Sequence, residues 1–391
     1  MSPFFCASPI YFIKFAASYK KRFVKKKHAL FDYLVLFPLS LLYGAVVAIR
    51  NWMFNVGILS SQEFKIPVIS VGNITVGGTG KTPHVEYLVS LLRKDFHLAV
   101  LSRGYKRKTR GFVKASASTG VLQIGDEPLQ IHRKFPGVSV VVDESRVHGI
   151  NRLLQNDEKL NAVILDDAYQ HRYVHAGINI LLIDYDRMIN HDHLLPFGRL
   201  RESAREKRRA NIIIITKCPA RIKPIEKRLV YKELNLFPYQ TLFFTTLQYD
   251  EPLPVFGNAA EVPDKKAWKN RKPNVLMLTG IANPRLFKKQ IRSITTKITE
   301  LAYPDHHNYK LKDLQKIISE YEKIPADDKI IITTEKDAMR LQEFEEFSEQ
   351  LRDILFYIPV RVVFMEDKGE NFKKIITNYV RNNKAYSKLH Q

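Results

Sequence analysis

A glycine-rich stretch beside a lysine and a threonine is the part of this chain best suited to phosphate chemistry. Ile66–Thr82 reads IPVISVGNITVGGTGKT, an apolar run, then a turn, then the start of a helix-like segment. This is the order of a P-loop, in which backbone N–H groups and a helix N-terminus bind phosphate oxygens. Lys81 would reach the β- and γ-phosphates, and Thr82 would place its hydroxyl on Mg²⁺. The predicted nucleotide-binding residues are Thr75, Val76, Gly77, Gly78, Thr79, Gly80, Lys81 and Thr82.

One position departs from the usual P-loop pattern G-x-x-x-x-G-K-[ST], because Thr75 stands where the first glycine is expected. A glycine-rich hairpin turn with a chance Lys-Thr pair is the alternative interpretation. The flanks argue against it. Ile66, Val68 and Ile69 fit a buried strand, and apolar residues recur at helical spacing over 85–92. The stretch predicts a nucleotide site without specifying the reaction.

A second chemical pattern follows the apolar segment Ala162–Leu165, which runs into Asp166 and Asp167. An apolar strand ending in a carboxylate is the Walker-B arrangement, which holds Mg²⁺ directly or through water. A strand-end aspartate that makes a turn is the simpler alternative. Together with a P-loop upstream, the pattern favours a metal site formed by Thr82, Asp166 and Asp167.

The composition indicates a globular protein with an anionic partner. The 391 residues are enough for two domains, and the apolar fraction of 45% is ordinary. The formal net charge of +22 implies nucleic acid, an anionic membrane or a phosphorylated substrate. The two cysteines make neither a disulfide framework nor a metal site, so a reducing compartment is expected.

The N-terminal region combines an aromatic-rich piece, a lysine-rich cluster at 20–27 and the uncharged run Tyr33–Ile49. A signal peptide fits poorly, since the apolar stretch lies far from the start and lacks a clear cleavage site. A spanning helix, a helix lying in the membrane interface and a buried core helix remain open. The adjoining cations favour membrane association, with lysines and arginine on anionic headgroups and with Tyr43 and Trp52 at the boundary.

The elements that must position these groups alternate between strands and helices, which predicts a mostly parallel sheet with helices on both faces. Further strands are expected at His97–Leu101, Val138–Val142, Ile178–Ile183 and Ile212–Ile215. Proline-rich 250–273 reads as a linker. We therefore expect a P-loop NTPase-type α/β domain at 61–249 and a smaller C-terminal α/β domain at 274–391. They follow a membrane-associating segment at 1–60.

Two other polar clusters are ambiguous from spacing alone. Asp126, in Gly125-Asp126-Glu127-Pro128, fits a helix cap better than a catalytic group. Asp305-His306-His307 could be a turn, a general base oriented by a carboxylate, or less plausibly a metal site. The basic loop that begins at Arg103 could hold a phosphate or be a solvated turn.

Several separate motifs in one order resemble the tetraacyldisaccharide 4′-kinase family of lipid A biosynthesis. They are GNITVGGTGKTP at 72–83, SRGY at 102–105, GDEP at 125–128, DDAYQH at 166–171, LPFGRLRE at 195–202, YPDHHNY at 303–309 and TEKDA at 334–338. The resemblance runs from the apolar N-terminal segment to the C-terminal domain, and the non-glycine at position 75 looks typical of the family.

The resemblance implies that the γ-phosphate of ATP, with Mg²⁺, goes to the 4′-hydroxyl of tetraacyldisaccharide 1-phosphate, giving lipid IVA. It also implies the cytoplasmic face of the bacterial inner membrane, with the N-terminal segment as anchor. By position, Asp126 matches the catalytic aspartate, acting with a histidine that we assign to His306 rather than His307. Supporting positions near the site are Glu127, Gln170, Glu202 and Arg103. The catalytic histidine would come from the second domain, so the two domains should close over the sugar.

Other functions compete with this interpretation. A membrane-associated P-loop ATPase of the partitioning or targeting kind usually has a lysine before the paired glycines, where this chain has Val76. A GTP switch is disfavoured because Thr216-Lys217-Cys218-Pro219 lacks the Asn-Lys-x-Asp guanine reader. Nucleic acid is not expected as a partner, since the basic residues are dispersed and no binding motif accompanies them.

Overall fold

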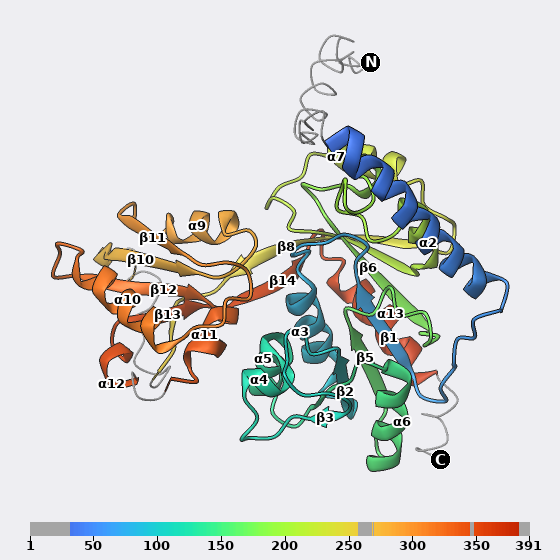
Figure 1. Ribbon diagram of the computed structural model, residues 1–391, viewed down its shortest axis with the longest axis horizontal. Helices are drawn as coiled ribbons and strands as arrows, with labels where there is room; N and C mark the ends of the chain where they lie inside the picture. Colours follow the sequence, from blue (N-terminus) through green and yellow to red (C-terminus); the bar gives the residue numbers. More distant parts are fainter. Residues whose placement is uncertain (1–31, 257–267, 269, 345–347, 383–391) are drawn as a thin grey trace, which may run out of the picture.

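The computed structural model describes residues 32–256, 268, 270–344 and 348–382. Two sheets organise this part of the chain, and Figure 1 shows them in two lobes. The predicted α/β class, with mostly parallel sheets and an apolar N-terminal helix, is confirmed. The lysine-rich cluster predicted to meet headgroups lies outside the described residues.

The first sheet has nine strands in the order β14-β8-β7-β6-β1-β5-β2-β4-β3. Neighbouring strands in this sheet are parallel, except at the two edges, where β3 is antiparallel to β4 and β14 is antiparallel to β8. The strands are β1 (Val68–Gly72), β2 (Leu98–Ser102), β3 (Val113–Lys114), β4 (Ser139–Val142), β5 (Ala162–Asp166), β6 (Ile178–Asp184), β7 (Ile212–Thr216), β8 (Thr241–Tyr249) and β14 (Val360–Phe364).

Helices cover both faces of this sheet, which explains why its central strands are mostly apolar and do not alternate between apolar and polar residues. Every residue of β1, β2, β5 and β7 is buried. One face packs against α3 (Lys81–Leu92), α5 (Asp126–Lys134) and α13 (Gly369–Arg381). The other packs against α6 (Arg146–Asn156) and α7 (Pro224–Leu234). The short helices α4 (Val121–Ile124), η2 (Ile189–His191) and η3 (Ala204–Arg209) lie in the connections.

The second sheet has the order β11-β10-β12-β13-β9, parallel except for the short edge strand β9. Its strands are β9 (Leu253–Pro254), β10 (Asn274–Thr279), β11 (Ile298–Ala302), β12 (Lys329–Thr334) and β13 (Leu355–Ile358). Its helices are α9 (Arg285–Ile291), α10 (Leu311–Glu322), α11 (Glu335–Leu341) and α12 (Ser348–Leu351).

The end of the chain returns to the first sheet, whereas the sequence placed 274–391 in one C-terminal unit. Pro359 separates β13, in the second sheet, from β14, which pairs with β8 in the first. Phe372, Ile376 and Val380 of α13 are buried in the same core as α3. Strands β8 and β14 therefore form a two-stranded connection toward the second sheet (Figure 1). The division into domains stays a prediction, with 360–381 packed on the first sheet.

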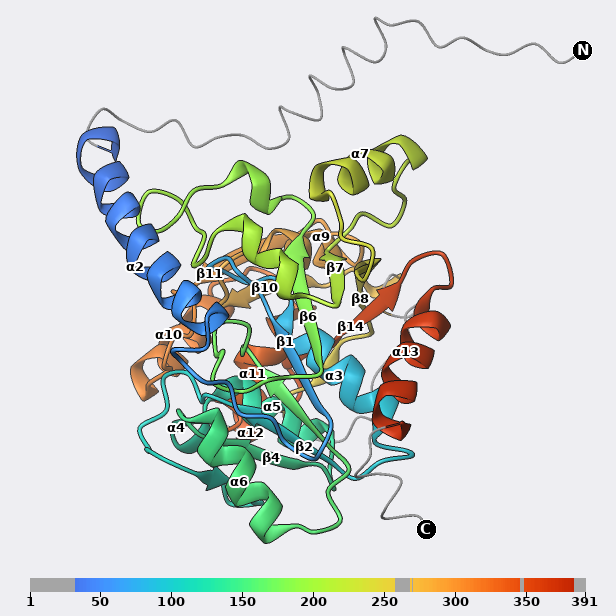
Figure 2. The same cartoon turned by 90° about the vertical axis from the view of Figure 1, so that its right-hand side faces the viewer.

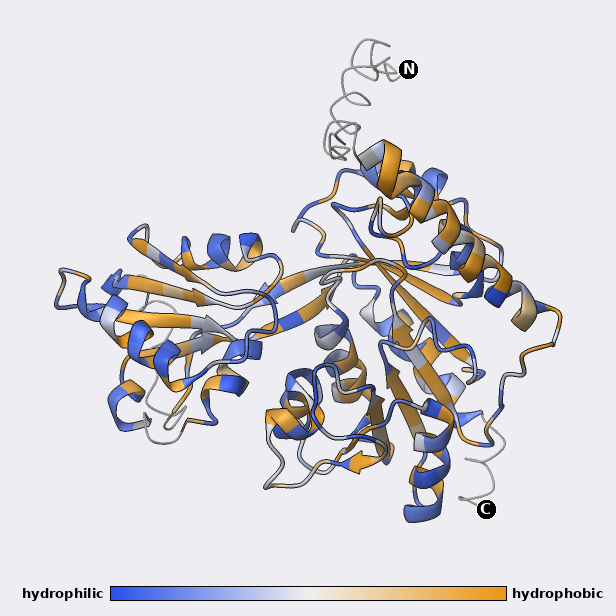
Figure 3. Ribbon diagram, viewed as in Figure 1, coloured by the Kyte–Doolittle hydropathy of each residue, from blue (hydrophilic) through white to orange (hydrophobic). Residues whose placement is uncertain are grey.

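A helix that presents its apolar side to solvent lies along the first unit. The chain enters it through a π-helical turn, η1 (Asp32–Leu36), and continues as α2 (Phe37–Asn55). By length and composition, Tyr33–Asn55 is long and apolar enough to cross a membrane, yet only 6% of its most apolar window is buried. Figure 2 shows α2 along the outside of the first lobe, and Figure 3 shows that most of its residues are hydrophobic. Several of these side chains are more than half exposed, among them Leu41, Leu42 and Val46. This exposure excludes the interpretation of α2 as a buried core helix.

Candidate active site

The P-loop forms the turn between β1 and α3, at the carboxyl end of the central strand of the first sheet. Gly77 and Gly80 have φ values of 101° and 85°, a region that favours glycine, and Gly80 directly precedes the first turn of α3. Asn73 donates to the Thr79 hydroxyl at 2.9 Å, and the Thr216 hydroxyl donates to the Thr79 carbonyl at 2.8 Å. The loop is thereby held open for an anion at the helix N-terminus.

A buried histidine supports the same turn from inside α3. His84 Nδ1 lies 2.7 Å from the Gly80 carbonyl, and Nε2 lies 3.0 Å from the Thr245 hydroxyl. Burial lowers the pKa of His84 to about 4, so the ring is neutral and its Nδ1–H can donate to the carbonyl. The geometry of Gly80 is therefore tied to β8, which carries Thr245.

The carboxylates after β5 lie beside the P-loop because β5 pairs in parallel with β1, where Val71 faces Asp166. Lys81 Nζ is 3.5 Å from Asp167 Oδ1, and Arg201 Nη1 is 3.5 Å from Asp167 Oδ2. Asp167 adopts φ 48°, which turns the chain directly after the strand. The predicted Walker-B residues and P-loop lysine are thus brought together.

The surroundings of the two aspartates shift their pKa values in opposite directions. Burial raises the pKa of Asp166 to about 7, helped by the nearby charges of Glu127 and Asp167. Burial also opposes ionisation of Asp167, but the charges of Lys81 and Arg201 outweigh it and lower the pKa of that carboxyl. Asp166 Oδ1 is buried and has no hydrogen-bond partner among the described residues. A cation at this point would supply the missing partner.

These groups fit a nucleotide with Mg²⁺. The loop offers N–H groups and Lys81 to phosphates, while Asp166 and Asp167 offer carboxylate oxygens to the metal. Across the described ranges, no group of three or more His, Cys, Asp and Glu side chains forms a complete metal site. Mg²⁺ is commonly held by one or two carboxylates plus substrate phosphates, which matches such a partial set.

The segment that precedes η3 forms the wall of the P-loop. The Val76 N–H donates to the Arg199 carbonyl at 2.8 Å, and the Arg201 N–H donates to the Ile74 carbonyl at 2.8 Å. This pairing fixes the backbone on both sides of Thr75 and directs Arg201 toward Asp167. The role of Arg201 was not predicted from the sequence, although the residue stands in the LPFGRLRE motif.

Two of the predicted supporting residues, Gln170 and Glu202, link α2 to the segments around the P-loop. Gln170 Nε2 donates to the Asn73 carbonyl at 2.7 Å, and Arg50 of α2 donates to the Gln170 carbonyl at 2.7 Å. Glu202 is buried and pairs with Arg209, and Asn51 of α2 lies 3.4 Å from it. The helix with the apolar outer face is therefore bonded to the nucleotide loop. The other two predicted supporting residues are Arg103 and Glu127. Arg103 directly follows β2 and is exposed, and Glu127 Oε1 lies 3.0 Å from Lys336 Nζ.

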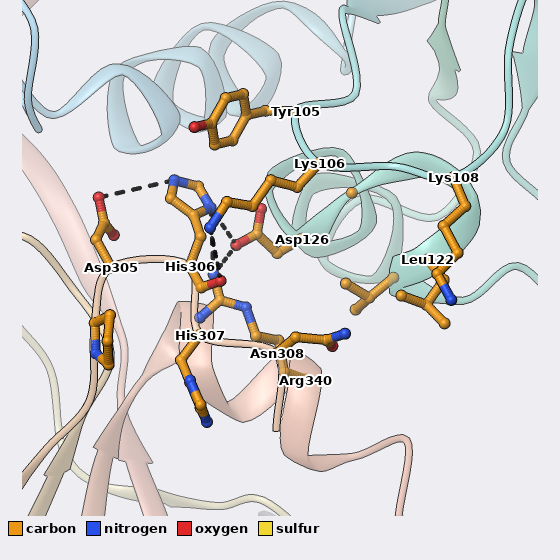
Figure 4. Close-up of a pocket in the computed structure, with 13 residues that line it drawn as sticks. Tyr105, Lys106, Lys108, Leu122, Asp126, Asp305, His306, His307, Asn308 and Arg340 are labelled. Atoms are coloured by element: carbon orange, nitrogen blue, oxygen red, sulfur yellow. Dashed lines mark hydrogen bonds and ion pairs between the residues drawn. The ribbon is translucent and has the colours of Figure 1, made fainter. Parts of the chain in front are cut away.

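The dyad predicted from the resemblance is assembled across the two sheets (Figure 4). His306 Nδ1, in the loop after β11, lies 3.0 Å from Asp126 Oδ2, in the first turn of α5. The helix-cap interpretation of Asp126 is wrong, because Gly125 is the N-cap of α5 and Asp126 is the first helical residue, whose Oδ1 accepts the adjacent Glu127 N–H at 3.0 Å. The Tyr105 ring packs edge-on against His306 with centroids 4.9 Å apart. The two lobes therefore touch at this point.

His307 points away from this pair, as Figure 4 shows. Its Nε2 lies 3.1 Å from Asp313 Oδ2, and its ring stacks on Tyr303 at 4.5 Å. His307 therefore holds the loop on α10, while His306, at φ 55°, faces Asp126. The geometry favours His306 as the dyad histidine.

Two cations that sequence reasoning missed surround Asp126, and both come from α11. Arg340 is buried and forms an ion pair with Asp126 Oδ2, and Lys336 Nζ lies 3.7 Å from the same oxygen. Burial opposes ionisation of Asp126, but its hydrogen bond with His306 and the charges of Lys336 and Arg340 lower the pKa of the carboxyl strongly. The sequence contains a signal for these cations. Lys336 lies within the TEKDA motif just after the end of β12, and Arg340 follows one helical turn later.

A pocket of about 460 Å³ opens in front of the dyad, between the two lobes. It is lined from the first lobe by Tyr105, Lys106 and Lys108, and from the second by Asp305 and Asn308 (Figure 4). Lys106 also donates to the His306 carbonyl at 3.2 Å. The pocket is basic, so it suits an anionic acceptor whose reacting group meets Asp126 and His306.

Comparisons with known proteins identify the family of this chain. A model of the family described as tetraacyldisaccharide-1-P 4′-kinase (LpxK) matches residues 33–381. The tetraacyldisaccharide 4′-kinase of Bacteroides thetaiotaomicron is 46% identical over 89% of this chain and 93% of that protein. That of Flavobacterium johnsoniae is 41% identical over 89% and 97%. The crystal structure of LpxK from Aquifex aeolicus in complex with ATP aligns with a TM-score of 0.67 at 31% identity, covering 88% of this chain and 98% of that one. The chain belongs to the tetraacyldisaccharide 4′-kinase family.

Proposed function

We propose that this protein transfers the γ-phosphate of ATP to the 4′-hydroxyl of tetraacyldisaccharide 1-phosphate, with Asp126 and His306 acting on the hydroxyl. Membership of a kinase family supports the reaction, and an ATPase of the partitioning or targeting kind is not favoured by the relatives. The observation that carries the residue assignment is the 3.0 Å contact between Asp126 of α5, in the first lobe, and His306 of the loop after β11, in the second lobe.

Phosphoryl transfer needs held phosphates and an oriented nucleophile. Lys81 and the loop N–H groups hold the phosphates, and Mg²⁺ bound at Asp166 and Asp167 would neutralise their charge. The 4′-oxygen bonds to the γ-phosphorus as the bond to the bridging oxygen breaks, and ADP leaves. The hydroxyl proton goes late to His306 Nε2, and the resulting imidazolium is paired with Asp126. Asp126 itself stays ionised, because its cationic neighbours lower its pKa.

The proposal places the protein on the cytoplasmic face of the bacterial inner membrane, with α2 in the interface. Polar side chains of α2 face the protein: Ser40 donates to the Leu194 carbonyl and Tyr43 to the Arg201 carbonyl, each at 2.9 Å. Apolar side chains such as Leu42 and Val46 are 65% and 61% exposed. A helix bonded along its length to the catalytic unit fits a position parallel to the bilayer surface better than a span across it.

The test uses ATP labelled on the γ-phosphate, Mg²⁺ and the tetraacyldisaccharide 1-phosphate in detergent micelles. Lipid products are separated by thin-layer chromatography, with Lys81→Ala as the control. Label in a lipid product that the control loses supports the proposed reaction. Label released only as inorganic phosphate would overturn it and favour the ATPase alternative.

A further inference from the structure

Lys336, in the first turn of α11, contacts the histidine nitrogen that the proposed reaction uses. Its Nζ lies 2.9 Å from His306 Nε2 and 3.0 Å from Glu127 Oε1. The side chain is 18% exposed, so this geometry is fixed by packing. Burial disfavours its charge, but Glu127 and Asp126 outweigh that effect and raise the pKa of Lys336. The group is therefore an ammonium.

An ammonium determines the tautomer of the ring that it touches, because it has three donors and no lone pair. Nε2 must accept from Lys336, so in the neutral ring the proton sits on Nδ1. The Nδ1–H then points at Asp126 Oδ2, 3.0 Å away. Arg340 Nη2 lies 3.4 Å from His306 Nδ1, but a guanidinium nitrogen can only donate. Arg340 Nη2 and His306 Nδ1 therefore both donate to Asp126 Oδ2.

We propose that Lys336 is a positioning residue for phosphoryl transfer that acts through His306, by keeping the lone pair on Nε2 until the acceptor hydroxyl takes its place. This inference rests on the proposed function of the Asp126–His306 pair. Glu127 gives Lys336 a second acceptor at 3.0 Å, so the ammonium stays bound when the hydroxyl reaches Nε2. The lysine thereby presents the correct nitrogen without taking part in proton transfer.

A double-mutant cycle on the full-length protein separates action through His306 from a structural effect. Lys336→Met, His306→Ala and the double variant are assayed for kcat and for the KM of ATP with the lipid acceptor. Lys336→Gln, whose amide can still donate to Nε2, is added in case the methionine variant does not fold. Lys329→Met is the matched control, since Lys329 of β12 donates to the carbonyls of Tyr321, Glu322 and Ile324, at the end of α10 and just beyond it, and none of these residues belongs to the dyad.

Lys336→Met should lower kcat by about tenfold or more while the KM of ATP stays within about twofold, the loss expected for a weakened general base. Lys336→Gln should retain more kcat than Lys336→Met. In the His306→Ala background, Lys336→Met should cost nothing further, whereas Lys329→Met should leave kcat unchanged in either background. A loss from Lys336→Met that multiplies with that of His306→Ala would overturn the inference. Unchanged kcat in His306→Ala alone would instead overturn the dyad, and the two failures are distinct.

Discussion

Glu86 and Glu335 belong to helices on different sheets, and they share one ammonium: Lys134 Nζ lies 2.7 Å from a carboxylate oxygen of each. Gln130 also donates to Glu86 at 2.7 Å. The helix after the P-loop, the helix of Asp126 and the helix of Lys336 and Arg340 are therefore joined by one partly exposed lysine between two buried carboxylates. Two of these helices, α5 and α11, also carry Asp126 and its two cationic neighbours Lys336 and Arg340, so the cluster joins the same two elements across the lobes.

Replacing Lys134 with methionine should destabilise the protein, because two buried carboxylates lose their shared cation. Breaking a buried pair costs about 3–5 kcal/mol, and the partial exposure of Lys134 places the expected loss nearer 2 kcal/mol. Thermal unfolding measures it. Lys323→Met is the control, because Lys323 pairs with Glu320 on the surface and should be nearly neutral. Equal losses in the two variants would contradict the role given to the cluster.

The same cluster predicts a pH dependence of stability. Burial and the charge of Glu335 raise the pKa of Glu86 to about 7, from a model-compound value of 4.5. Between these values the folded protein holds a proton that the unfolded chain has lost, so this group's contribution to stability falls as pH rises from 4.5 toward 7. Glu86→Gln removes the titration. As pH rises over this range, the melting temperature of Glu86→Gln should therefore increase relative to that of the parent. A difference in melting temperature that does not change with pH would contradict the raised pKa of Glu86.

The local parts of the site were predictable from sequence, because each depends on a few adjacent residues. The apolar run before GGTGKT and the run ending in Asp166-Asp167 specify strands, and parallel strands bring their carboxyl ends to one edge. Lys81 and Asp167 accordingly meet at 3.5 Å. The alternation of strands and helices likewise predicted the first sheet.

What joins distant segments could not be derived from spacing. Asp126 looks like a helix cap until His306, 180 residues later, lies beside it, so its role came from the family resemblance. The pairing of β14 with β8 matches Val360 to Tyr249 across the whole second sheet, and no local pattern encodes that register. Lys336 and Arg340 were overlooked because cations on a short helix are usually solvated.

Asp167→Asn should raise the Mg²⁺ concentration needed for half-maximal kinase activity and lower kcat. The carboxylate is ionised between Lys81 and Arg201, so the amide removes an anionic ligand and leaves two cations facing each other. A Mg²⁺ titration of lipid phosphorylation measures the change. Asp157→Asn is the control, since Asp157 pairs with His97 far from the P-loop edge. An unaltered Mg²⁺ dependence in Asp167→Asn would remove it from the metal site.

The outer face of α2 should determine membrane binding. The double change Leu42→Gln and Val46→Gln removes two exposed apolar side chains one turn apart without touching the inner face. Each buried aliphatic side chain contributes about 1.5–3 kcal/mol, so binding to vesicles containing anionic lipid should weaken about a hundredfold or more. Vesicle co-sedimentation measures it, and the KM of ATP in detergent should not change. Full sedimentation of the variant would show that α2 is not the membrane contact.

Arg340 should be irreplaceable by lysine, because its two guanidinium nitrogens serve two carboxylates. Nη2 pairs with Asp126 and Nη1 lies 2.9 Å from Asp337 Oδ1. Asp337 is itself fixed, since its Oδ2 accepts from the Gly280 N–H at 2.8 Å and from the Thr334 hydroxyl at 2.7 Å. A single ammonium cannot span both partners with the same geometry. Arg340 thus connects the end of β10 to the dyad.

Arg340→Lys should therefore lower kcat by about tenfold or more while the KM of ATP stays close to that of the parent, because the loss falls on the hydroxyl-activating pair and not on the P-loop. Steady-state kinetics with varied ATP and varied lipid separate these effects. Arg381→Lys is the matched control, since Arg381 is exposed and its ion pair with Asp95 is long, at 3.9 Å, so the change should affect neither kcat nor KM. If Arg340→Lys raised the KM of ATP and spared kcat, Arg340 would belong to nucleotide binding, and Asp126 would not depend on it for orientation.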